Sequence, residues 1–293
     1  MTVVMLGAGL MGSQIGYEYL LSGHDVVWIV RDTERAAAAI DRARSVAIEG
    51  GLVSSEQTRE HGARQTIVTS VADVAEVPEI VVESVAEDLD TKAELLSSCA
   101  RVWPEAILAS NTSSIEIGRI GSAVGAPERT VGTHYWNPPL LMPLVEVISG
   151  PQTSPAVVRH VVDLLENVGK RPVQVDHDVP GFVWNRLQFA LLREALWLVD
   201  SGVASPEAVD LVVRDGLARR WQLTGPFETA ELGGVQTFAA IAALLFPALS
   251  SDRDAPSLAT WEPRDAAALE QLERRRDAAL AAALLRERES TRH

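Results

Sequence analysis

Residues 2–20 of this chain read TVVMLGAGLMGSQIGYEYL, and this stretch decides the fold. Its first five residues are a short, largely apolar run, and the glycine-rich segment GAGLMG follows at 7–12. Beyond the glycines, the side chains of Ile15, Tyr19 and Leu20 have the spacing of one helix face. The order strand, G-x-G-x-x-G, helix is the one that a dinucleotide-binding βαβ unit requires.

Each glycine of this segment has a physical role. Gly7 permits the tight turn, Gly9 lets the backbone approach a pyrophosphate, and Gly12 lets the helix pack close to the strand. The backbone amides at the start of the helix, where Leu10 and Met11 lie, face the phosphates and attract their negative charge. We therefore predict a dinucleotide site built from Gly7, Gly9, Leu10, Met11 and Gly12.

The end of the next predicted strand bears on the choice of cofactor. NAD-binding folds usually place an acidic residue there, which accepts hydrogen bonds from the adenosine ribose. Here the position holds Val30, which has no acceptor, and Arg31 and Asp32 follow it. An arginine can bind a 2′-phosphate, so the pattern favours NADP(H) over NAD, with Arg31 as a cofactor-binding residue. The alternative is NAD, with Arg31 facing solvent and Asp32 reaching the ribose.

Strand-like and helix-like segments alternate from residue 1 to about residue 177, which is typical of an α/β fold with a Rossmann-type doubly wound sheet. Later strands are expected at 66–69, 80–83, 107–110, 131–134, 145–148 and 172–174, and helices at 34–49, 91–102, 155–168, 185–200 and 206–215. From Pro180 onward the pattern is helical and ends in a charged, alanine-rich helix. We predict a dinucleotide-binding domain over 1–178 and an all-α domain over 179–293.

The composition of the 293 residues limits the class of protein. A hydrophobic content of 47% with 23% charged residues is typical of a globular protein with a substantial core, and no run approaches a membrane span. A net charge of −14 argues against nucleic-acid and anionic-membrane partners. Cys99 is the only cysteine, and the chain starts with its first predicted strand, which leaves no room for a signal peptide. We expect a cytoplasmic protein that acts on a small molecule, with no metal site.

A second informative stretch, residues 131–149, reads VGTHYWNPPLLMPLVEVIS. Glu146 is the lone charge in an apolar, strand-like run, and burying a carboxylate there is costly unless it has a partner. His134, twelve residues earlier, is a natural partner. A carboxylate bound to one ring nitrogen fixes the tautomer and leaves the other nitrogen to act as a base. The alternative is a surface loop followed by an ordinary strand.

Further polar side chains follow the ends of predicted strands, where open parallel sheets bind their ligands. The hydroxyl-rich segment SNTSS follows one strand at 110–114, Asn137 comes three residues after His134, and Asn185 opens the helical domain. Taken singly, each is explained as well by a turn or a helix cap. Their convergence with a His–Glu pair beside a nicotinamide site favours an oxidoreductase.

The chain resembles the 3-hydroxyacyl-CoA dehydrogenase family over nearly its whole length. The resemblance is carried by GAGLMG at 7–12, VVESVAEDLDTK at 81–92, SNTSS at 110–114, GTHYWNP at 132–138, PLVEVI at 143–148, DVPGFVWNRL at 178–187 and GPFE at 225–228. Together these segments are far more specific than a shared dinucleotide-binding fold. The resemblance implies an NAD(P)-dependent dehydrogenase that interconverts a 3-hydroxyacyl(-CoA) substrate and its 3-keto form.

The resemblance also implies roles for individual residues and an oligomeric state. Four residues would be catalytic: His134 as the base, Glu146 as its orienting partner, and Ser113 and Asn185 as contacts of the reacting oxygen or of the substrate. Three more would line the cofactor and substrate cleft: Glu87, Lys92 and Asn137. Members of the family are commonly dimeric through the helical domain, so a homodimer is implied.

Departures from the family affect the choice of substrate more than the choice of reaction. Tyr135-Trp136 stands where members often have two phenylalanines, and Trp184 stands where a smaller aliphatic residue is frequent. We place the acyl-CoA substrate first. The alternatives are free hydroxy acids, such as gulonate or carnitine, and a pyridine carboxylate alcohol or aldehyde. Two non-enzyme alternatives are a catalytically silent structural relative, as in the eye lens, and a cofactor-bound regulatory module. The complete catalytic set argues against the silent relative.

Overall fold

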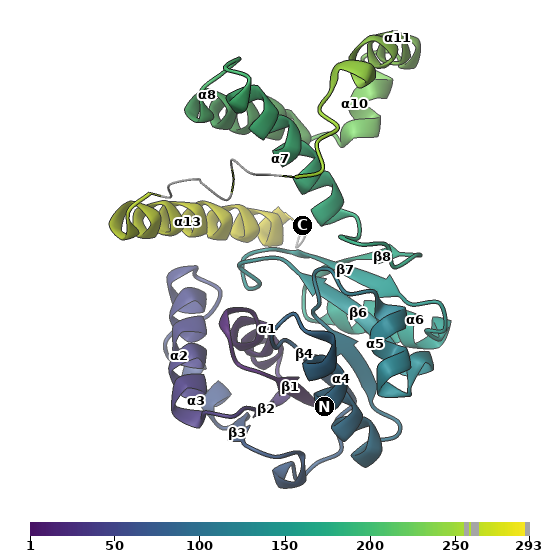
Figure 1. Ribbon diagram of the computed structural model, residues 1–293. Helices are drawn as coiled ribbons and strands as arrows, with labels where there is room; N and C mark the ends of the chain where they lie inside the picture. Colours follow the sequence, from purple (N-terminus) through teal and green to yellow (C-terminus); the bar gives the residue numbers. More distant parts are fainter. Residues whose placement is uncertain (255–257, 259–263, 291–293) are drawn as a thin grey trace. The chain divides into compact units, whose positions relative to one another are not determined.

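The computed structural model describes residues 1–254, 258 and 264–290, and its strands form an eight-stranded sheet (Figure 1). The strands are β1 (Thr2–Leu6), β2 (Asp25–Ile29), β3 (Gln65–Val68), β4 (Ile80–Glu83), β5 (Ile107–Ser110), β6 (Thr130–Tyr135), β7 (Leu144–Ser149) and β8 (Arg171–Val175). Their order is β3-β2-β1-β4-β5-β6-β7-β8, with β6 and β7 antiparallel and the other pairs parallel. The strand order reverses between β1 and β4, so the predicted doubly wound α/β fold is confirmed.

Helices cover both faces of the sheet. The helices α1 (Leu10–Leu21), α2 (Thr33–Glu49) and α6 (Pro155–Asn167) pack on one face, and α4 (Leu89–Val102) and α5 (Ile117–Val124) pack on the other (Figure 1). In α2, the buried residues Ala36, Ala39, Ile40, Ala43 and Ala47 recur every three or four positions and so form one apolar face. Because both faces are covered, the central strands β1 and β4 are buried along their whole length.

The remaining elements of the described chain are all helical: three short ones lie between the strands, and the others follow residue 183. They are α3 (Gln57–Gly62), η1 (Val71–Asp73), η2 (Pro127–Arg129), α7 (Trp184–Asp200), α8 (Pro206–Leu211), η3 (Val212–Leu217), α9 (Ala218–Trp221), α10 (Pro226–Leu232), α11 (Val235–Leu245), η4 (Phe246–Ala248) and α13 (Ala266–Ser290). The helix expected at 206–215 runs farther, because η3 is a π-helical segment that continues into α9, and the break comes only before Pro226. The helix predicted at the end of the chain is α13; residues 291–293 lie outside the described residues.

The chain divides into two compact units. The first comprises Met1–Val183 with Asp265–His293, and the second comprises Trp184–Arg264. In the first unit, Ala281 and Leu284 of α13 are buried, and Glu287 of α13 forms an ion pair with Arg171 at 2.9 Å. The division at 178 and 179 stays a prediction.

Across the described residues, no single helix has both the length and the apolar character needed to cross a bilayer. One bent pair, Pro226–Leu232 with Val235–Ala248, meets the length and composition criteria together, with a bend of 116°.

Candidate active site

The glycine-rich turn between β1 and α1 has the geometry of a phosphate site. Gly7 has a φ of +92°, and a Cβ there would lie 2.9 Å from the carbonyl oxygen of Ser84. A Cβ on Gly12 would lie 2.4 Å from the carbonyl oxygen of Gly7, whereas a Cβ on Gly9 would meet nothing within 4 Å. The backbone therefore closes tightly around Gly7 and Gly12 and leaves room beside Gly9.

The start of α1 offers backbone amides to that room. The amide of Ser13 donates to the carbonyl oxygen of Gly9 at 3.0 Å, and the amides of Leu10, Met11 and Gly12 precede it in the first turn of the helix. No side chain caps this helix start and no acidic residue lies in its first turn. Amides and a partial positive charge at a helix N-terminus attract phosphate. The five residues predicted for the nucleotide site thus lie together, and they fit a dinucleotide.

The end of β2 lies beside this turn, because β1 and β2 are parallel and in register. Val30 packs into the core, whereas Arg31 and Asp32 are exposed. The Asp32 side chain accepts a hydrogen bond from the amide of Arg35 at 2.9 Å and so caps the N-terminus of α2. One oxygen of Asp32 is therefore engaged in the fold. Contact between Arg31 and a 2′-phosphate stays a prediction.

His134 and Glu146 are direct partners in the antiparallel register of β6 and β7. His134 Nδ1 and Glu146 Oε2 are 2.6 Å apart, and both side chains are buried. Glu146 Oε1 accepts a hydrogen bond from the amide of Val183 at 2.9 Å, and the ring of Phe182 packs against the His134 ring with centroids 5.6 Å apart. The carboxylate is held at both oxygens and the imidazole at Nδ1. Nε2 is thus the ring nitrogen that can exchange a proton with a substrate.

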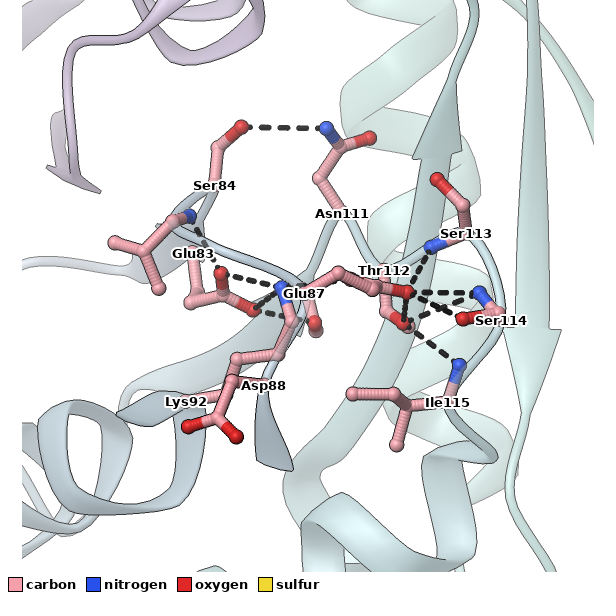
Figure 2. Close-up of polar contacts among 12 residues, drawn as sticks. Glu83, Ser84, Glu87, Asp88, Lys92, Asn111, Thr112, Ser113, Ser114 and Ile115 are labelled. Atoms are coloured by element: carbon pink, nitrogen blue, oxygen red, sulfur yellow. Dashed lines mark hydrogen bonds and ion pairs between the residues drawn. The ribbon is translucent and has the colours of Figure 1, made fainter. Parts of the chain in front are cut away.

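A buried lysine joins two carboxylates beside the segment 110–114 (Figure 2). Lys92 of α4 is 1% exposed, and its Nζ lies 2.8 and 3.0 Å from the two oxygens of Glu83 at the end of β4. The same Nζ is 3.2 Å from Glu87 Oε2. Glu83 also accepts a hydrogen bond from the hydroxyl of Ser110 at 2.5 Å. The ammonium thus joins Glu83 to Glu87 after β4, and the Ser110 hydroxyl links Glu83 to the end of β5. Contact between Lys92 and a cofactor stays a prediction.

Glu87 holds the loop that follows β5 (Figure 2). Its Oε1 accepts hydrogen bonds from the hydroxyl of Thr112 at 2.6 Å, the amide of Ser113 at 2.8 Å and the amide of Ser114 at 2.9 Å. Burial opposes ionisation of Glu87, but these hydrogen bonds and the charge of Lys92 outweigh it and lower the pKa to about 2. Glu87 is therefore a carboxylate at neutral pH, and it fixes the backbone on which Ser113 stands.

Two residues outside the predicted site connect its parts. Asn111 donates a hydrogen bond to the hydroxyl of Ser84 at 3.2 Å and accepts one from the amide of Tyr135 at 2.9 Å, so it links the ends of β4, β5 and β6. Glu83 is the anchor of Lys92. The sequence contains a pattern that indicates Glu83: it is the lone carboxylate at the end of an apolar strand, just as Glu146 is the lone carboxylate within one.

The other predicted residues lie as follows. Ser113 and Asn137 are exposed and follow the carboxyl ends of β5 and β6, and the neighbouring strand β4 is followed by the segment that carries Glu87. Asn185 lies in the first turn of α7, in the second unit. The first unit thus brings the glycine-rich turn, Ser113, His134 and Asn137 to the carboxyl edge of the sheet, where open α/β sheets bind ligands. The roles of these side chains stay predictions.

Two family descriptions match adjacent parts of the chain. Residues 2–179 match the NAD binding domain of 3-hydroxyacyl-CoA dehydrogenase, and residues 181–276 match its C-terminal domain. A 5-formyl-3-hydroxy-2-methylpyridine 4-carboxylate 5-dehydrogenase of Mesorhizobium japonicum is 33% identical over 257 residues, 86% of this chain and 82% of the relative. A probable 3-hydroxybutyryl-CoA dehydrogenase of Deinococcus radiodurans is 37% identical over 259 residues, 86% of this chain and 90% of the relative. Among solved structures, a 5-formyl-3-hydroxy-2-methylpyridine 4-carboxylic acid 5-dehydrogenase, described as an NAD⁺-dependent dismutase, superposes with a TM-score of 0.86 at 28% identity, covering 96% of each chain.

Proposed function

This chain belongs to the 3-hydroxyacyl-CoA dehydrogenase family of NAD-dependent oxidoreductases, and from that premise we propose that it interconverts a 3-hydroxyacyl substrate and its 3-keto form with His134 as the general base. The observation that carries the proposal is the buried contact of 2.6 Å between His134 Nδ1 and Glu146 Oε2. A base that is oriented by a carboxylate, itself held by a backbone amide, has one fixed direction for proton transfer.

The side chains would divide the work as follows. In the oxidation direction, His134 Nε2 takes the proton of the substrate hydroxyl, and Glu146 stabilises the imidazolium that forms. Ser113 donates a hydrogen bond to the same oxygen, and Asn137 and Asn185 position the substrate. In reduction, protonated His134 returns the proton to the carbonyl oxygen. The nicotinamide cofactor, when bound, supplies or accepts the hydride, while the protein contributes orientation and proton transfer.

Two parts of the chain would contact two parts of the cofactor. The glycine-rich turn with Leu10 and Met11 would hold the pyrophosphate on the amides of α1. For the adenosine end we propose that Arg31 favours NADP(H) over NAD. Two features support this: Arg31 is exposed at the end of β2, and Asp32 already accepts a hydrogen bond from Arg35 as a helix cap.

A free aromatic hydroxy compound is the second candidate substrate. It is favoured by the TM-score of 0.86 over 96% of both chains with the dehydrogenase of a pyridine carboxylate. Trp136, two residues after His134, supports it too, because the face of an indole ring suits a planar ligand. The two candidates share the proton chemistry of His134 and differ in the groups that hold the rest of the substrate.

The second unit supports the proposal of a homodimer through the helical domain. Several of its large apolar side chains are exposed: Leu223 is 86% exposed, Phe227 84%, Leu232 79% and Leu244 78%. Apolar side chains that gather on one unit mark an interface, and a second copy would cover the same surface on both partners. Sedimentation equilibrium should give twice the chain mass, and Leu244→Asp should shift the protein toward monomer.

We infer a cytoplasmic location, with which the single, buried Cys99 is compatible because the fold needs no internal disulfide.

The proposal is tested with a substrate panel and one variant. The panel contains short acyl-CoA esters, free 3-hydroxy acids and aromatic alcohols, each with NAD and NADP, and absorbance of the reduced nicotinamide is the readout. His134→Gln should lower kcat by about 10²–10⁴, the span of a general acid–base group, with cofactor affinity unchanged. The matched control is His160→Gln, because His160 also pairs with a carboxylate, Glu79, but on the surface of the fold. His160→Gln should leave kcat unchanged, and a His134→Gln enzyme with more than about half the wild-type kcat would contradict the proposed base.

A further inference from the structure

Lys170 forms a buried polar junction that the proposed reaction does not use. Its Nζ lies 2.6 Å from Glu18 Oε1 and donates to the carbonyl oxygens of Pro139 at 2.7 Å and Met142 at 2.8 Å. An ammonium has three donors, and here three oxygens take them. Lys170 and Glu18 are both at most 5% exposed, so this junction lies inside the fold rather than on its surface.

The two carbonyl groups belong to the loop that joins β6 to β7. This loop, residues 136–143, includes Asn137, which is followed by Pro138 and Pro139, neither of which has an amide hydrogen to donate. Leu140 and Leu141 turn into the core and are 0% and 2% exposed. The loop is therefore anchored by its leucines and by Lys170, and its ends lead directly into the strands that carry the His–Glu pair.

Glu18 brings the other end of the junction from α1, the helix whose first turn forms the nucleotide site. Two further contacts also join α1 to β6 and to the loop that follows it. Gln14 of α1 accepts a hydrogen bond from the amide of Leu140 at 3.4 Å, and the hydroxyls of Tyr19 and Tyr135 are 3.4 Å apart. The ion pair of Glu18 is the shortest of these links and the only one of the three that carries charge.

Stability alone does not account for a charged pair at this place. Burial raises the pKa of Glu18 despite the attraction of Lys170, and burial lowers the pKa of Lys170 despite the attraction of Glu18. Both directions show that desolvation outweighs the mutual attraction. In addition, Glu18 Oε2 has no hydrogen-bond partner among the residues that the structure describes. Apolar residues of similar volume stabilise an interior at least as well as such a pair.

We propose that Lys170 is a positioning residue that couples the cofactor helix α1 to the catalytic hairpin of β6 and β7. The inference rests on the proposed roles of His134 and Asn137. Ordering of the first turn of α1 by the cofactor is transmitted through Glu18 to Lys170, and from Lys170 to the loop carbonyls beside Asn137. Binding of the cofactor thereby fixes the loop from which the substrate groups project.

The test uses hydrogen exchange with and without NAD, measured by mass spectrometry on peptides that cover residues 136–145. The main variant combines Lys170→Met with Glu18→Gln, because removing both charges together leaves no lone carboxylate in the interior. Glu18→Gln alone is the second variant; it keeps the ammonium on both carbonyl groups and weakens only the link to α1. The matched control is Arg129→Met. Arg129 directly precedes β6 and, like Lys170, donates to backbone carbonyl groups, those of Ala100, Trp103 and Ala106.

In the wild type and in Arg129→Met, NAD should slow exchange in the loop. In the double variant NAD should still bind, because the glycine-rich turn is intact, but this slowing should be lost, and Glu18→Gln should show a reduced effect. The kcat of the double variant should fall about ten- to hundredfold with KM for NAD unchanged, the scale of a small misplacement of reacting groups.

The coupling is overturned if NAD slows loop exchange as much in the double variant as in the wild type, or has no effect on the loop in the wild type. Failure of the double variant to fold leaves the decision to Glu18→Gln, which must then lose part of the slowing. Because hydrogen exchange needs no substrate, a wild type that turns over nothing in the panel counts against the proposed reaction and leaves the test of Lys170 intact.

Discussion

Alanine at Gly9 should separate cofactor binding from folding. The backbone of Gly9 has a φ of −72°, which alanine adopts without strain, and the added Cβ would meet no protein atom within 4 Å. Replacing glycine by alanine at a helix N-cap destabilises by roughly 0.5–1 kcal/mol, and the smaller entropy of the unfolded alanine chain stabilises by about 0.4–1 kcal/mol. These effects offset each other, so the free energy of unfolding of Gly9→Ala should stay close to that of the wild type.

Cofactor affinity should respond differently, because we propose that the pyrophosphate approaches the amides of α1 through the open space beside Gly9. A methyl group there would cost at least one hydrogen bond to a charged phosphate, worth about 1.5–3 kcal/mol. Since 1.4 kcal/mol is a factor of ten, the Kd for NAD should rise about ten- to hundredfold. Titration calorimetry measures this Kd, and urea unfolding measures the stability.

Gly16→Ala is the matched control on the same helix. A Cβ on Gly16 would lie 2.3 Å from a ring carbon of Trp28, a fully buried residue whose Nε1 donates to the carbonyl oxygen of Gly12 at 3.1 Å. Overpacking of this kind destabilises by about 1–3 kcal/mol. The two variants should thus show opposite patterns, with Gly9→Ala changing affinity and Gly16→Ala changing stability. An unchanged Kd in Gly9→Ala would refute the position assigned to the pyrophosphate.

Three further predictions concern specificity and pH. Replacing Arg31 by Ala should abolish a preference of kcat/KM for NADP(H) over NAD, and a wild type that prefers NAD would show that Arg31 faces solvent. The bulk of Trp136 should keep kcat/KM from rising with acyl chain length, and a steady rise from short to long acyl substrates would contradict a small or flat pocket. Glu87 has a folded pKa of about 2, below its ordinary 4.5, so its ionisation stabilises the fold above pH 4.5, and this contribution is lost as the pH falls toward 2. Because the Glu87 side chain is 37% exposed, solvent screening reduces this contribution to the order of 1 kcal/mol. Urea unfolding should show that Glu87→Gln is less stable than the wild type, and the difference in the free energy of unfolding should shrink as the pH is lowered. A difference that does not depend on pH would contradict the assigned role of the Glu87 carboxylate.

Local sequence patterns predict the parts of this fold that repeat over short distances. The strands expected at 80–83 and 107–110 lie at Ile80–Glu83 and Ile107–Ser110, because apolar runs bounded by polar residues leave little choice of register. Strand ends are less well determined: the strand expected at 131–134 extends by one residue at each end, to Thr130–Tyr135. Backbone pairing with β5 and β7, which a local pattern does not contain, decides those last residues.

Buried charges show where sequence reasoning succeeds and where it stops. A lone carboxylate in an apolar run must have a partner, which is how Glu146 indicates His134 across the hairpin. The same reasoning applies to Glu83, yet its partner Lys92 lies on the helix after the strand, in a segment with several other charges.

For Glu18, the partner Lys170 lies in another part of the sequence altogether. The two meet because α1 and α6 pack on the same face of the sheet (Figure 1). Lys170, in the turn after α6, thereby reaches the carbonyl groups of the loop from β6 to β7. Burial cost therefore identifies which charges need a partner, whereas strand order decides which partner each one meets. Strand order is a property of the whole sheet, so the junctions that it creates become visible only in the folded chain.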